Sequence, residues 1–404
     1  MNHPTLTLKP AKEYPIKAGH PWIFSNAIER EPRSELGDLV IVESYGGEPL
    51  GIGMINPQNS IRVRMITRDA TIPIDTDFLS NRLKELDGLK KAYLPTKTSG
   101  YRLCHADADG LPGLIVDRYS DALVFQISTA GMERLKDKVI EALQKTFKPV
   151  ILVERSDLDS RGQEGLTATA PEIHHGTLKG PLLFMEHGIK FVADLMQGQK
   201  TGFFLDQRET RQRIRELSKG RRVLNLFAYS GASSVYAALG GATEITTVDT
   251  SASALELAKQ NLKLNGLNPE DEERFQFMEA DVFELFKTKS FKAPYDLIIC
   301  DPPAFAKSSA GVMRALEAYK SLNQRCLWML HEGGILVSSS CSGRVSAEDF
   351  RNTLRIAAGH TGREARVLDF LGQPFDHTEK LSFPEGRYLK TAILEITRAA
   401  KEIV

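Results

Sequence analysis

The chain has 404 residues, 42% of them apolar and 26% charged, and its 52 lysines and arginines equal its 52 aspartates and glutamates in number. At about 150 residues per domain this length predicts two or three folded domains, and the composition argues against wholesale disorder. The balanced charge excludes a polybasic nucleic-acid coat protein, so any RNA-binding charge must be gathered into patches.

The four cysteines are Cys104, Cys300, Cys326 and Cys341. They show no CxxC spacing and lie near no histidine pair, which argues against a metal site, and a disulfide framework is not expected in a chain of this size. "MNHPTLTLKP" lacks the apolar core of a signal peptide, and no run of about 18 apolar residues exists to span a membrane. We expect a soluble protein of a reducing cytoplasm that uses neither a metal nor a membrane.

Residues 1 to about 73 contain short β-rich stretches separated by turn residues. "GDLVIVES" and "IRVRMITRD" are the clearest strands, and Gly46-Gly47 and Asn56-Pro57 are turn signals. This pattern predicts a small β-barrel or sandwich.

Residues 74 to about 185 mix helices and strands. "FLSNRLKELDGLKKAYL" predicts a helix, and "GLIVDRYSDALVFQI" predicts a hairpin that turns at Ser120-Asp121. A helix near 131–147 then precedes the strand "VILVERSD". We expect a central α/β domain in which strands flank a helix.

Strands and helices alternate from about residue 186 to residue 404. Strands separated by helices predict a largely parallel, doubly wound sheet, and their continuous apolar runs suit burial on both faces. The last two strands have no helix between them, so we expect that pair to be antiparallel. The predicted helices are 232–239, 252–265, 312–330 and 346–358, and the predicted strands are "RVLNLFAY", "EITTVDT", "FQFMEAD", "YDLIICD", "GILVSSS", "ARVLDFL" and "LKTAILEIT".

The first turn of this sheet is a candidate ligand site, because doubly wound sheets bind ligands beyond the carboxyl ends of their strands. "LNLFAYSGASS" joins a strand to a helix through Gly231. It lacks the GxGxxG dinucleotide fingerprint, and alone it indicates no more than a tight turn.

Three acids strengthen that indication. Asp249, Asp281 and Asp301 are each the first acid after an apolar run, so they are expected along one rim of the sheet. A carboxylate at the second strand end is placed for ribose hydroxyls, and one at the third is placed for an adenine amino group. A helix N-cap is the alternative for each aspartate taken singly.

The acids, the turn and the antiparallel end of the sheet together resemble class I S-adenosylmethionine (SAM)-dependent methyltransferases. The resemblance implies SAM as the cofactor and implies that "QGQKTGFFLDQRETR" covers it, with an amphipathic lead-in helix as the alternative. The cofactor candidates are Lys200, Thr201, Gly202, Phe203, Asp206, Gln207 and Arg208 from this stretch, Asn225, Phe227, Ala228, Tyr229 and Gly231 from the turn, and Asp249, Asp281 and Asp301 from the strand ends.

"CDPPAFAKS" is the most specific motif of the chain. Pro302 and Pro303 stiffen the backbone after the strand and prevent a helix, so Asp301 is held where a planar substrate can lie. Related D/N-P-P loops in nucleic-acid methyltransferases hold a base beside the methyl donor, which makes Pro302, Pro303 and Phe305 the substrate-binding candidates. Phe305 can stack on that base, or it can simply pack against the next helix.

Cys341 follows the fifth strand of the sheet in "LVSSSCSG". That strand is expected beside the fourth, which leads to Asp301, so the two side chains can face one cleft. The pair suggests methylation of C5 of a pyrimidine, because a thiolate that adds at C6 turns the ring into an enamine and makes C5 nucleophilic. Asp301 is then placed to bond the N3/N4 edge of cytosine. We take Cys341 and Asp301 as the catalytic candidates.

Core packing is the alternative role for each cysteine. Cys300 adjoins Asp301 on a strand whose side chains alternate, so it is expected to point into the core. Cys326 lies in the apolar helical stretch "NQRCLWML" and is expected in the core as well, whereas Cys104 is assigned no role. For Cys341 the neighbouring serines argue against deep burial.

The whole chain resembles the PUA-domain-containing class I methyltransferases of the large-subunit ribosomal RNA cytosine-5 family. The resemblance implies a PUA β-barrel at 1–73, a central α/β domain at 74–185 and a Rossmann-like methyltransferase domain at 186–404. It also implies SAM as methyl donor, 23S rRNA as substrate and partner, and Cys341 as nucleophile. The matching stretches, in order, are "GHPWIFSNAI", "GIGMINPQNSIRVRMI", "DADGLPGLIVDRY", "DLMQGQKTGFFLDQR", "NLFAYSGASS", "CDPPAFAKS", "SSSCSG" and "FPEGRYLK".

The PUA resemblance supplies an RNA contact, since a small barrel recognises folded RNA mainly through its backbone and shape. Lys17, Arg62 and Arg64 are the candidate phosphate ligands, with ordinary solvated charges as the alternative. Trp22 is expected in the barrel core rather than as a platform for a base.

One position departs from many other RNA cytosine-5 methyltransferases, in which a second cysteine three residues after the motif aspartate releases the product. That position is Ala304 here, so the base that removes the C5 proton is not identified. Two other functions stay open: a guanine-nitrogen methyltransferase that forms no covalent adduct, and a non-catalytic RNA-binding assembly factor. A homodimer is common in such folds and also stays open.

Overall fold

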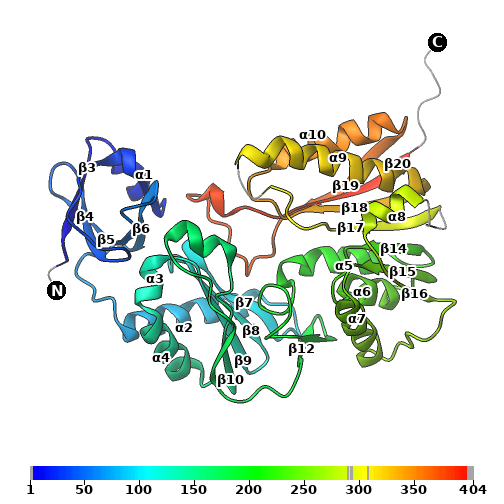
Figure 1. Ribbon diagram of the computed structural model, residues 1–404, viewed down its shortest axis with the longest axis horizontal. Helices are drawn as coiled ribbons and strands as arrows, with labels where there is room; N and C mark the ends of the chain where they lie inside the picture. Colours follow the sequence, from blue (N-terminus) through cyan, green and yellow to red (C-terminus); the bar gives the residue numbers. More distant parts are fainter. Residues whose placement is uncertain (1–2, 289–290, 292–293, 307–308, 398–404) are drawn as a thin grey trace, which may run out of the picture. The chain divides into compact units, whose positions relative to one another are not determined.

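The structure, a computed structural model, describes residues 3–288, 291, 294–306 and 309–397 (Figure 1). Contacts group the chain into two compact units. The first unit is Met1–Gly188, Val192–Leu205 and Phe375–Gly386, and the second is Ile189–Phe191, Asp206–Pro374 and Arg387–Val404. The predicted first and second domains therefore lie in the first unit, together with short stretches of the predicted third; the division into three domains stays a prediction.

The N-terminal part of the first unit is a six-stranded sheet. Its elements are β1 Thr5–Leu8, α1 Tyr14–Lys17, β2 Trp22–Phe24, η1 Ser25–Ala27, β3 Ile28–Arg30, β4 Leu39–Glu43, β5 Pro49–Ile55 and β6 Ile61–Thr67. The strand order is β2-β6-β5-β4-β1-β3. Side chains of short strands alternate between faces, and on the inner face Leu6, Val40 and Val63 are fully buried.

The central part of the first unit is a five-stranded sheet with helices. Its elements are α2 Thr76–Tyr93, β7 Gly100–His105, η2 Ala106–Asp109, β8 Leu114–Tyr119, β9 Ala122–Ile127, α3 Ala130–Arg134, α4 Lys136–Phe147, β10 Ile151–Glu154, η3 Asp159–Glu164, β11 Glu172–His175 and, after this sheet, β12 Leu182–Glu186. The strand order is β11-β10-β9-β8-β7. The predicted hairpin at Ser120-Asp121 is confirmed, whereas the helix predicted near 131–147 is two helices that divide at Leu135.

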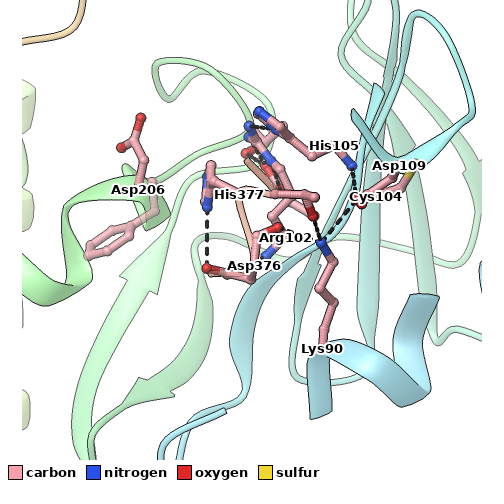
Figure 2. Close-up of polar contacts among 12 residues, drawn as sticks. Lys90, Arg102, Cys104, His105, Asp109, Asp206, Asp376 and His377 are labelled. Atoms are coloured by element: carbon pink, nitrogen blue, oxygen red, sulfur yellow. Dashed lines mark hydrogen bonds and ion pairs between the residues drawn. The ribbon is translucent and has the colours of Figure 1, made fainter. Parts of the chain in front are cut away.

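Residues 375–386 join the first unit through buried polar contacts (Figure 2). Lys90 on α2 is buried, and its Nζ lies 3.0 Å from Asp109 Oδ2 and 3.0 Å from the carbonyl oxygen of Asp376. The backbone N–H of Arg102 donates to Asp376 Oδ2 at 3.0 Å. The ion pair to Asp109 costs about 3–5 kcal/mol to break, because the partner charge would be left buried, and it holds the ammonium of Lys90 where it also bonds Asp376. These contacts explain why a short stretch late in the chain folds with a much earlier part.

The second unit is built on a seven-stranded sheet. In chain order the elements after β12 are β13 Ile189–Ala193, η4 Leu205–Gln207, α5 Arg208–Leu217, β14 Arg222–Leu226, α6 Ala232–Leu239, β15 Glu244–Asp249, α7 Ala252–Leu264, β16 Phe275–Glu279, α8 Val282–Thr288, β17 Tyr295–Cys300, η5 Ser309–Gly311, α9 Val312–Met329, β18 Leu330–Ser340, α10 Ala347–His360, β19 Glu364–Leu371, η6 Pro384–Gly386 and β20 Lys390–Thr397. Of these, η6 belongs to the first unit, and β13 and η4 each contain residues of both units. The order β16-β15-β14-β17-β18-β20-β19 is parallel up to β18. Strand β20 is antiparallel to both of its neighbours, which confirms the predicted antiparallel end.

Helices cover both faces of this sheet, with α9 and α10 on one face and α6 and α7 on the other (Figure 1). Leu224, Ile298 and Leu336 on the central strands are fully buried against the first pair. The predicted helix start at Ser346 is one residue early because this serine is the N-cap of α10: its Oγ accepts the N–H of Asp349 at 3.0 Å. Within the described ranges, no helix has both the length and the apolar character needed to cross a membrane.

Candidate active site

Strands β17 and β18 bring the two catalytic candidates to one edge of the sheet. They are parallel neighbours in which Cys300 lies opposite Ser338, so the prediction that the fourth and fifth strands are adjacent is confirmed. Parallel strands finish at the same edge. Asp301 directly follows β17 and Cys341 directly follows β18, and both therefore lie at that edge.

Cys341 is the cysteine that solvent can reach. The residue is partly exposed, and its sulfur lies 4.0 Å from the carbonyl oxygen of Pro302, the residue after Asp301. Cys300 and Cys326 are fully buried, which confirms their predicted place in the core, and burial raises the pKa of the Cys300 thiol. The thiol of Cys341 thus stands beside the DPP loop, where a substrate base is expected.

Gln207 orients the carboxylate of Asp301. Its Nε2 donates to Asp301 Oδ2 at 2.9 Å. Its amide oxygen Oε1 is buried and has no hydrogen-bond partner within the described ranges. An unpaired buried acceptor costs about 1–3 kcal/mol, so this oxygen fits a bound group that donates a hydrogen bond, such as the ammonium of SAM.

The turn after β14 has an unusual backbone. Phe227 and Tyr229 have φ angles of 59° and 47°, and Gly231 has a φ of 68°. Left-handed conformations of bulky residues cost of order 1–3 kcal/mol and occur preferentially at functional sites. A Cβ on Gly231 would lie only 2.4 Å from Cβ of Ala258, so glycine is required there. The N–H of Tyr229 donates to Asp249 Oδ2 at 2.8 Å, which joins the predicted turn to the predicted second-strand acid.

Three other predicted cofactor residues make local structural contacts. The N–H of Ala228 donates to the backbone of β15 at 3.0 Å. Asn225 Nδ2 donates to Ser234 Oγ on α6 at 2.9 Å and is buried. Asp281 is exposed and accepts the N–H of Phe283 at 2.7 Å, the capping role that was its alternative. The cofactor roles of these three residues stay predictions.

Asp206 and Arg208 flank Gln207 at the start of α5. Tyr388 Oη donates to Asp206 Oδ2 at 2.8 Å, so the lead-in to α5 is tied to the segment before β20. Arg208 is fully buried, with Nε 3.5 Å from Glu209 Oε1. A buried guanidinium needs such partners, because the uncompensated charge is costly to desolvate.

Lys200, Thr201, Gly202 and Phe203 belong to the first unit. Thr201 is fully buried, and its Oγ1 donates to Asp117 Oδ2 at 2.7 Å. Phe203 is buried as well and packs edge-on against an aromatic ring of β12. These contacts bind the stretch to the central sheet of its own unit, and its role at the cofactor stays a prediction.

The DPP loop presents one of its two prolines to solvent. Pro302 is buried and Pro303 is exposed. Phe305 is partly buried, with its ring centroid 4.8 Å from that of Tyr319 on α9. Packing against the next helix, the alternative for Phe305, is therefore present, and stacking on a base stays a prediction. Ala304 is exposed and has no group that accepts a proton.

Lys390, which the sequence analysis missed, holds the loop that carries Cys341. It is the first residue of β20 and is buried. Its Nζ donates to the carbonyl oxygens of Ser342 and Val345 at 2.7 Å and of Tyr388 at 2.8 Å. The three acceptors match the three N–H donors of an ammonium group. Burial lowers the pKa of Lys390 to about 8, and the neighbouring Cys341 acts in the opposite direction.

The sequence contained a signal for Lys390. It stands near the start of the predicted strand "LKTAILEIT", and lysine is almost never fully buried unless it is paired. The loop is held from α9 as well, because Tyr319 Oη and Ser342 Oγ lie 3.0 Å apart. Cys341 is therefore on a loop fixed from two sides.

The three predicted phosphate ligands of the N-terminal part are all paired with acids. Lys17, Arg62 and Arg64 each lie within an ion pair of the first unit. Arg64 has two acidic partners, with Nη1 3.2 Å from Asp107 Oδ1 and Nη2 3.0 Å from a second carboxylate. A cation with such partners must give them up before it can bind a phosphate, so these contacts support the alternative of ordinary charges.

A cluster of possible metal ligands lies at the edge of the central sheet. Single ligand atoms of Glu154, Glu172 and His174 lie within 4.8 Å of one another. Lys136 Nζ lies 3.0 Å from Glu154 Oε1, and His174 Nε2 lies 3.0 Å from Glu154 Oε2. These contacts pair the buried carboxylate with a lysine and a histidine.

Two family models match the sequence. Residues 169–380 match the S-adenosylmethionine-dependent methyltransferase family, and residues 6–68 match the PUA-like domain family. The first match includes the turn after β14, the DPP loop and Cys341.

Curated relatives match nearly the full length. The Aeromonas hydrophila protein named ribosomal RNA large subunit methyltransferase I is 40% identical over 397 residues, which cover 96% of this chain and 98% of the relative. The protein of the same name from Shewanella denitrificans is 38% identical over 396 residues, covering 97% and 99%.

Solved structures share the fold. A candidate SAM-dependent methyltransferase from Streptococcus mutans superposes with a TM-score of 0.82 at 24% identity, covering 97% of this chain and all of that one. A second structure, of a candidate methyltransferase complexed with SAH, gives the same TM-score and identity and covers 98% of this chain. At this level of identity the likeness concerns the fold.

Proposed function

We propose that this chain, which belongs to the S-adenosylmethionine-dependent methyltransferase family and carries an N-terminal PUA-like domain, methylates C5 of a cytosine in large-subunit ribosomal RNA. The observation that carries the proposal is the thiol of Cys341, partly exposed and 4.0 Å from the backbone of the DPP loop. The relatives named ribosomal RNA large subunit methyltransferase support the choice of RNA.

The chemistry requires a nucleophile because C5 of cytosine attacks a sulfonium methyl group poorly. In the proposed route the sulfur of Cys341 forms a bond to C6, the C5–C6 double bond is lost, a C4=C5 enamine double bond forms, and N3 takes up a proton. C5 then takes the methyl group, its proton is lost, and elimination of the sulfur restores the aromatic ring. A ring nitrogen of guanine needs no such adduct, so a partly exposed cysteine at this edge favours cytosine over the guanine-nitrogen alternative.

Asp301 is the second catalytic group of the proposal. Its carboxyl group is held by Gln207 at the edge that also carries Cys341. There it is placed to bond the N3/N4 edge of cytosine. This contact would orient the base so that the thiolate can approach C6 from one face of the ring. N3 gains electron density when sulfur adds at C6, and a carboxylic acid at that edge stabilises it by donating a proton to N3, while the resulting carboxylate accepts a hydrogen bond from the N4 amino group.

Lys390 is the positioning residue of the nucleophile. Its three hydrogen bonds fix the loop from Ser342 to Val345, directly after Cys341. A positive charge close to a thiol favours the thiolate, which is the nucleophilic form. The ammonium therefore fixes the position of the sulfur and favours its ionised form.

The cofactor has a matching set of polar groups in the second unit. Gln207 offers a buried amide oxygen without a partner, and Asp249 offers a carboxylate beside the strained turn at Tyr229. When bound, SAM supplies an electrophilic methyl group and leaves as SAH. Asp249 would accept ribose hydroxyls, and Gln207 would accept the ammonium.

Release of the product differs from enzymes that use a second cysteine. Ala304 occupies that position and cannot accept the C5 proton. The proton therefore passes to water or to another side chain before the sulfur leaves.

Mapping of methylated nucleotides tests the proposal. Large-subunit rRNA from cells with and without the gene, digested and analysed by mass spectrometry, is expected to differ by one 5-methylcytidine. A difference at a guanine nitrogen would establish the alternative enzyme, and no difference, despite SAM binding by the purified protein, would support the assembly factor.

A further inference from the structure

A cavity of about 650 Å³ lies within the first unit, apart from the methyltransferase sheet. It is lined by the loop before β2, the end of β6, the N-terminal half of α2 and Lys380. Three cations line it, Arg68, Arg82 and Lys380, and so do four acids. The question is which of these charges remain for a ligand.

Every acid of the cavity already has a partner. Asp75 caps α2 by accepting the N–H of Phe78 at 2.9 Å. Asp77 pairs with a lysine of α4 at 2.7 Å, and Glu85 pairs with Arg82 at 2.8 Å. Asp107 accepts from the indole N–H of Trp22 at 2.6 Å and pairs with an arginine of β6. The acids are therefore compensated inside the protein.

Two of the cations have no direct side-chain partner among the described residues. Arg68 and Lys380 make no side-chain hydrogen bond or ion pair with any part of the chain that the structure describes. Arg82 donates Nε and Nη2 to the carbonyl oxygen of Asp109 at 3.1 and 2.9 Å, so its guanidinium is fixed in the wall. Burial lowers the pKa of Lys380, repulsion from Arg68 and Arg82 adds to this effect, and attraction to Asp109 opposes it. An anion between the three would relieve that repulsion.

The position of Lys380 is built rather than accidental. Ser382 Oγ donates to the carbonyl oxygen of Gly19 at 3.0 Å, and the ring of Phe383 packs edge-on against Trp22 at 4.8 Å. His20 Nε2 lies 3.3 Å from Glu385 Oε2. Trp22 is partly buried under these contacts, so its predicted place in a core is only partly met. The stretch is thus attached to the PUA-like sheet around the cavity.

We propose that Arg68 and Lys380, with Arg82 beside them, bind a backbone phosphate of the RNA substrate in this cavity. The choice of RNA as the source of the phosphate rests on the proposed function, whereas the anion site itself does not. A guanidinium fork and an ammonium are the groups that bind phosphate best, and their pairing with RNA releases counterions. Inorganic phosphate shares the same chemistry, so the experiment must separate the two sources.

The proposed phosphate site lies on the segment of the chain that leads to the positioning residue Lys390. Lys380 lies in the stretch Phe375–Gly386, which belongs to the first unit. Ten residues later along the chain, Lys390 bonds the loop that carries Cys341. RNA bound through Lys380 would hold the segment that leads into β20.

Binding of unmodified large-subunit rRNA transcript, measured over a series of salt concentrations, tests the site. The variants are Arg68→Gln and the double variant with Lys380→Gln. Arg33→Gln is the matched control, because Arg33 is exposed in the same unit and does not line the cavity. We expect about 10-fold weaker binding for the double variant and a salt slope smaller by about 1 to 2, with the control unchanged. Arg68 is exposed, so its substitution leaves the fold intact even if the change at Lys380 does not.

The outcomes are distinct. Unchanged RNA affinity and salt slope in both variants would overturn the proposal. Stabilisation of the protein by millimolar inorganic phosphate that depends on Arg68, without any change in RNA binding, would assign the cavity to free phosphate and overturn it as well. RNA binding that depends on these cations, in a protein that forms no 5-methylcytidine, would keep this site and reject the proposed methylation instead.

Discussion

Lys390 and Lys380 are two lysines whose pKa burial lowers, yet their surroundings differ. The ammonium of Lys390 is enclosed by three carbonyl oxygens of its own unit. Lys380 instead faces other cations across a cavity and has no side-chain partner within the described ranges. Burial is common to both lysines, and they differ in the number of hydrogen-bond acceptors around the ammonium. Lys390, with three acceptors, fixes a loop, whereas Lys380, with none in the described part of the chain, is proposed to bind a ligand.

Removal of the nucleophile is expected to have the largest effect. Cys341→Ala should lower kcat by at least about 10³-fold, because no other described thiol is exposed and the C5–C6 bond is then not activated. SAM binding, measured by calorimetry, should stay within about twofold. Methylation that survives in this variant would contradict the covalent route, and Cys326→Ala serves as the control for loss of a buried thiol.

Removal of the positioning lysine should come next. Lys390→Met leaves the loop carbonyls without donors, so we expect kcat to fall about 10²-fold with a small change in KM. The rate of alkylation of Cys341 by iodoacetamide should reach its midpoint at a higher pH than in the parent protein. An unchanged alkylation profile would show that Lys390 supports the structure only.

The pH dependence sharpens the role of Lys390. Its pKa in the folded protein, about 8, lies below the usual lysine pKa of 10.5, so the unfolded chain binds more protons between these values. Its contribution to stability therefore rises with pH across that window. Activity should nevertheless fall as pH rises through about 8, because the neutral amine can donate to only two of the three carbonyls. Activity that falls only where the protein also unfolds would contradict this assignment.

A substitution at the strained turn after β14 should have a smaller effect on activity than the two changes above. It should destabilise the fold slightly and weaken SAM binding. Gly231→Ala adds a Cβ that would meet Ala258 at 2.4 Å and forces a φ of 68° on alanine. We expect the free energy of unfolding to drop by about 1–3 kcal/mol and SAM affinity to fall. Thermal melts with and without SAM measure both. Ala232→Gly, one residue later, is the control.

Local pattern predicted the second unit well. Alternating strands and helices gave the doubly wound sheet, and the absence of a helix between the last two strands gave the antiparallel end. Adjacency of β17 and β18 then placed Asp301 and Cys341 at one edge. These predictions succeeded because each depends on short-range periodicity and on a strand order that such sheets favour.

Contacts between distant parts of the chain could not be predicted in the same way. Nothing in the local pattern of residues 375–386 indicates that they fold with α2 and β7, because the stabilising partners, Lys90 and Arg102, lie far away in sequence. The three acceptors of Lys390 come from a loop well before it. Arg64 was a reasonable phosphate candidate until the structure showed its two acidic partners.

Trapping of the covalent intermediate tests the central claim most directly. RNA that contains 5-fluorocytosine at the target, incubated with the protein and SAM, should form a stable adduct, because fluorine at C5 cannot leave as a proton does. Peptide mass spectrometry should find the nucleotide on Cys341, and Cys341→Ser should abolish it. Efficient methylation of ordinary RNA with no trapped adduct, or an adduct on a different residue, would contradict the account.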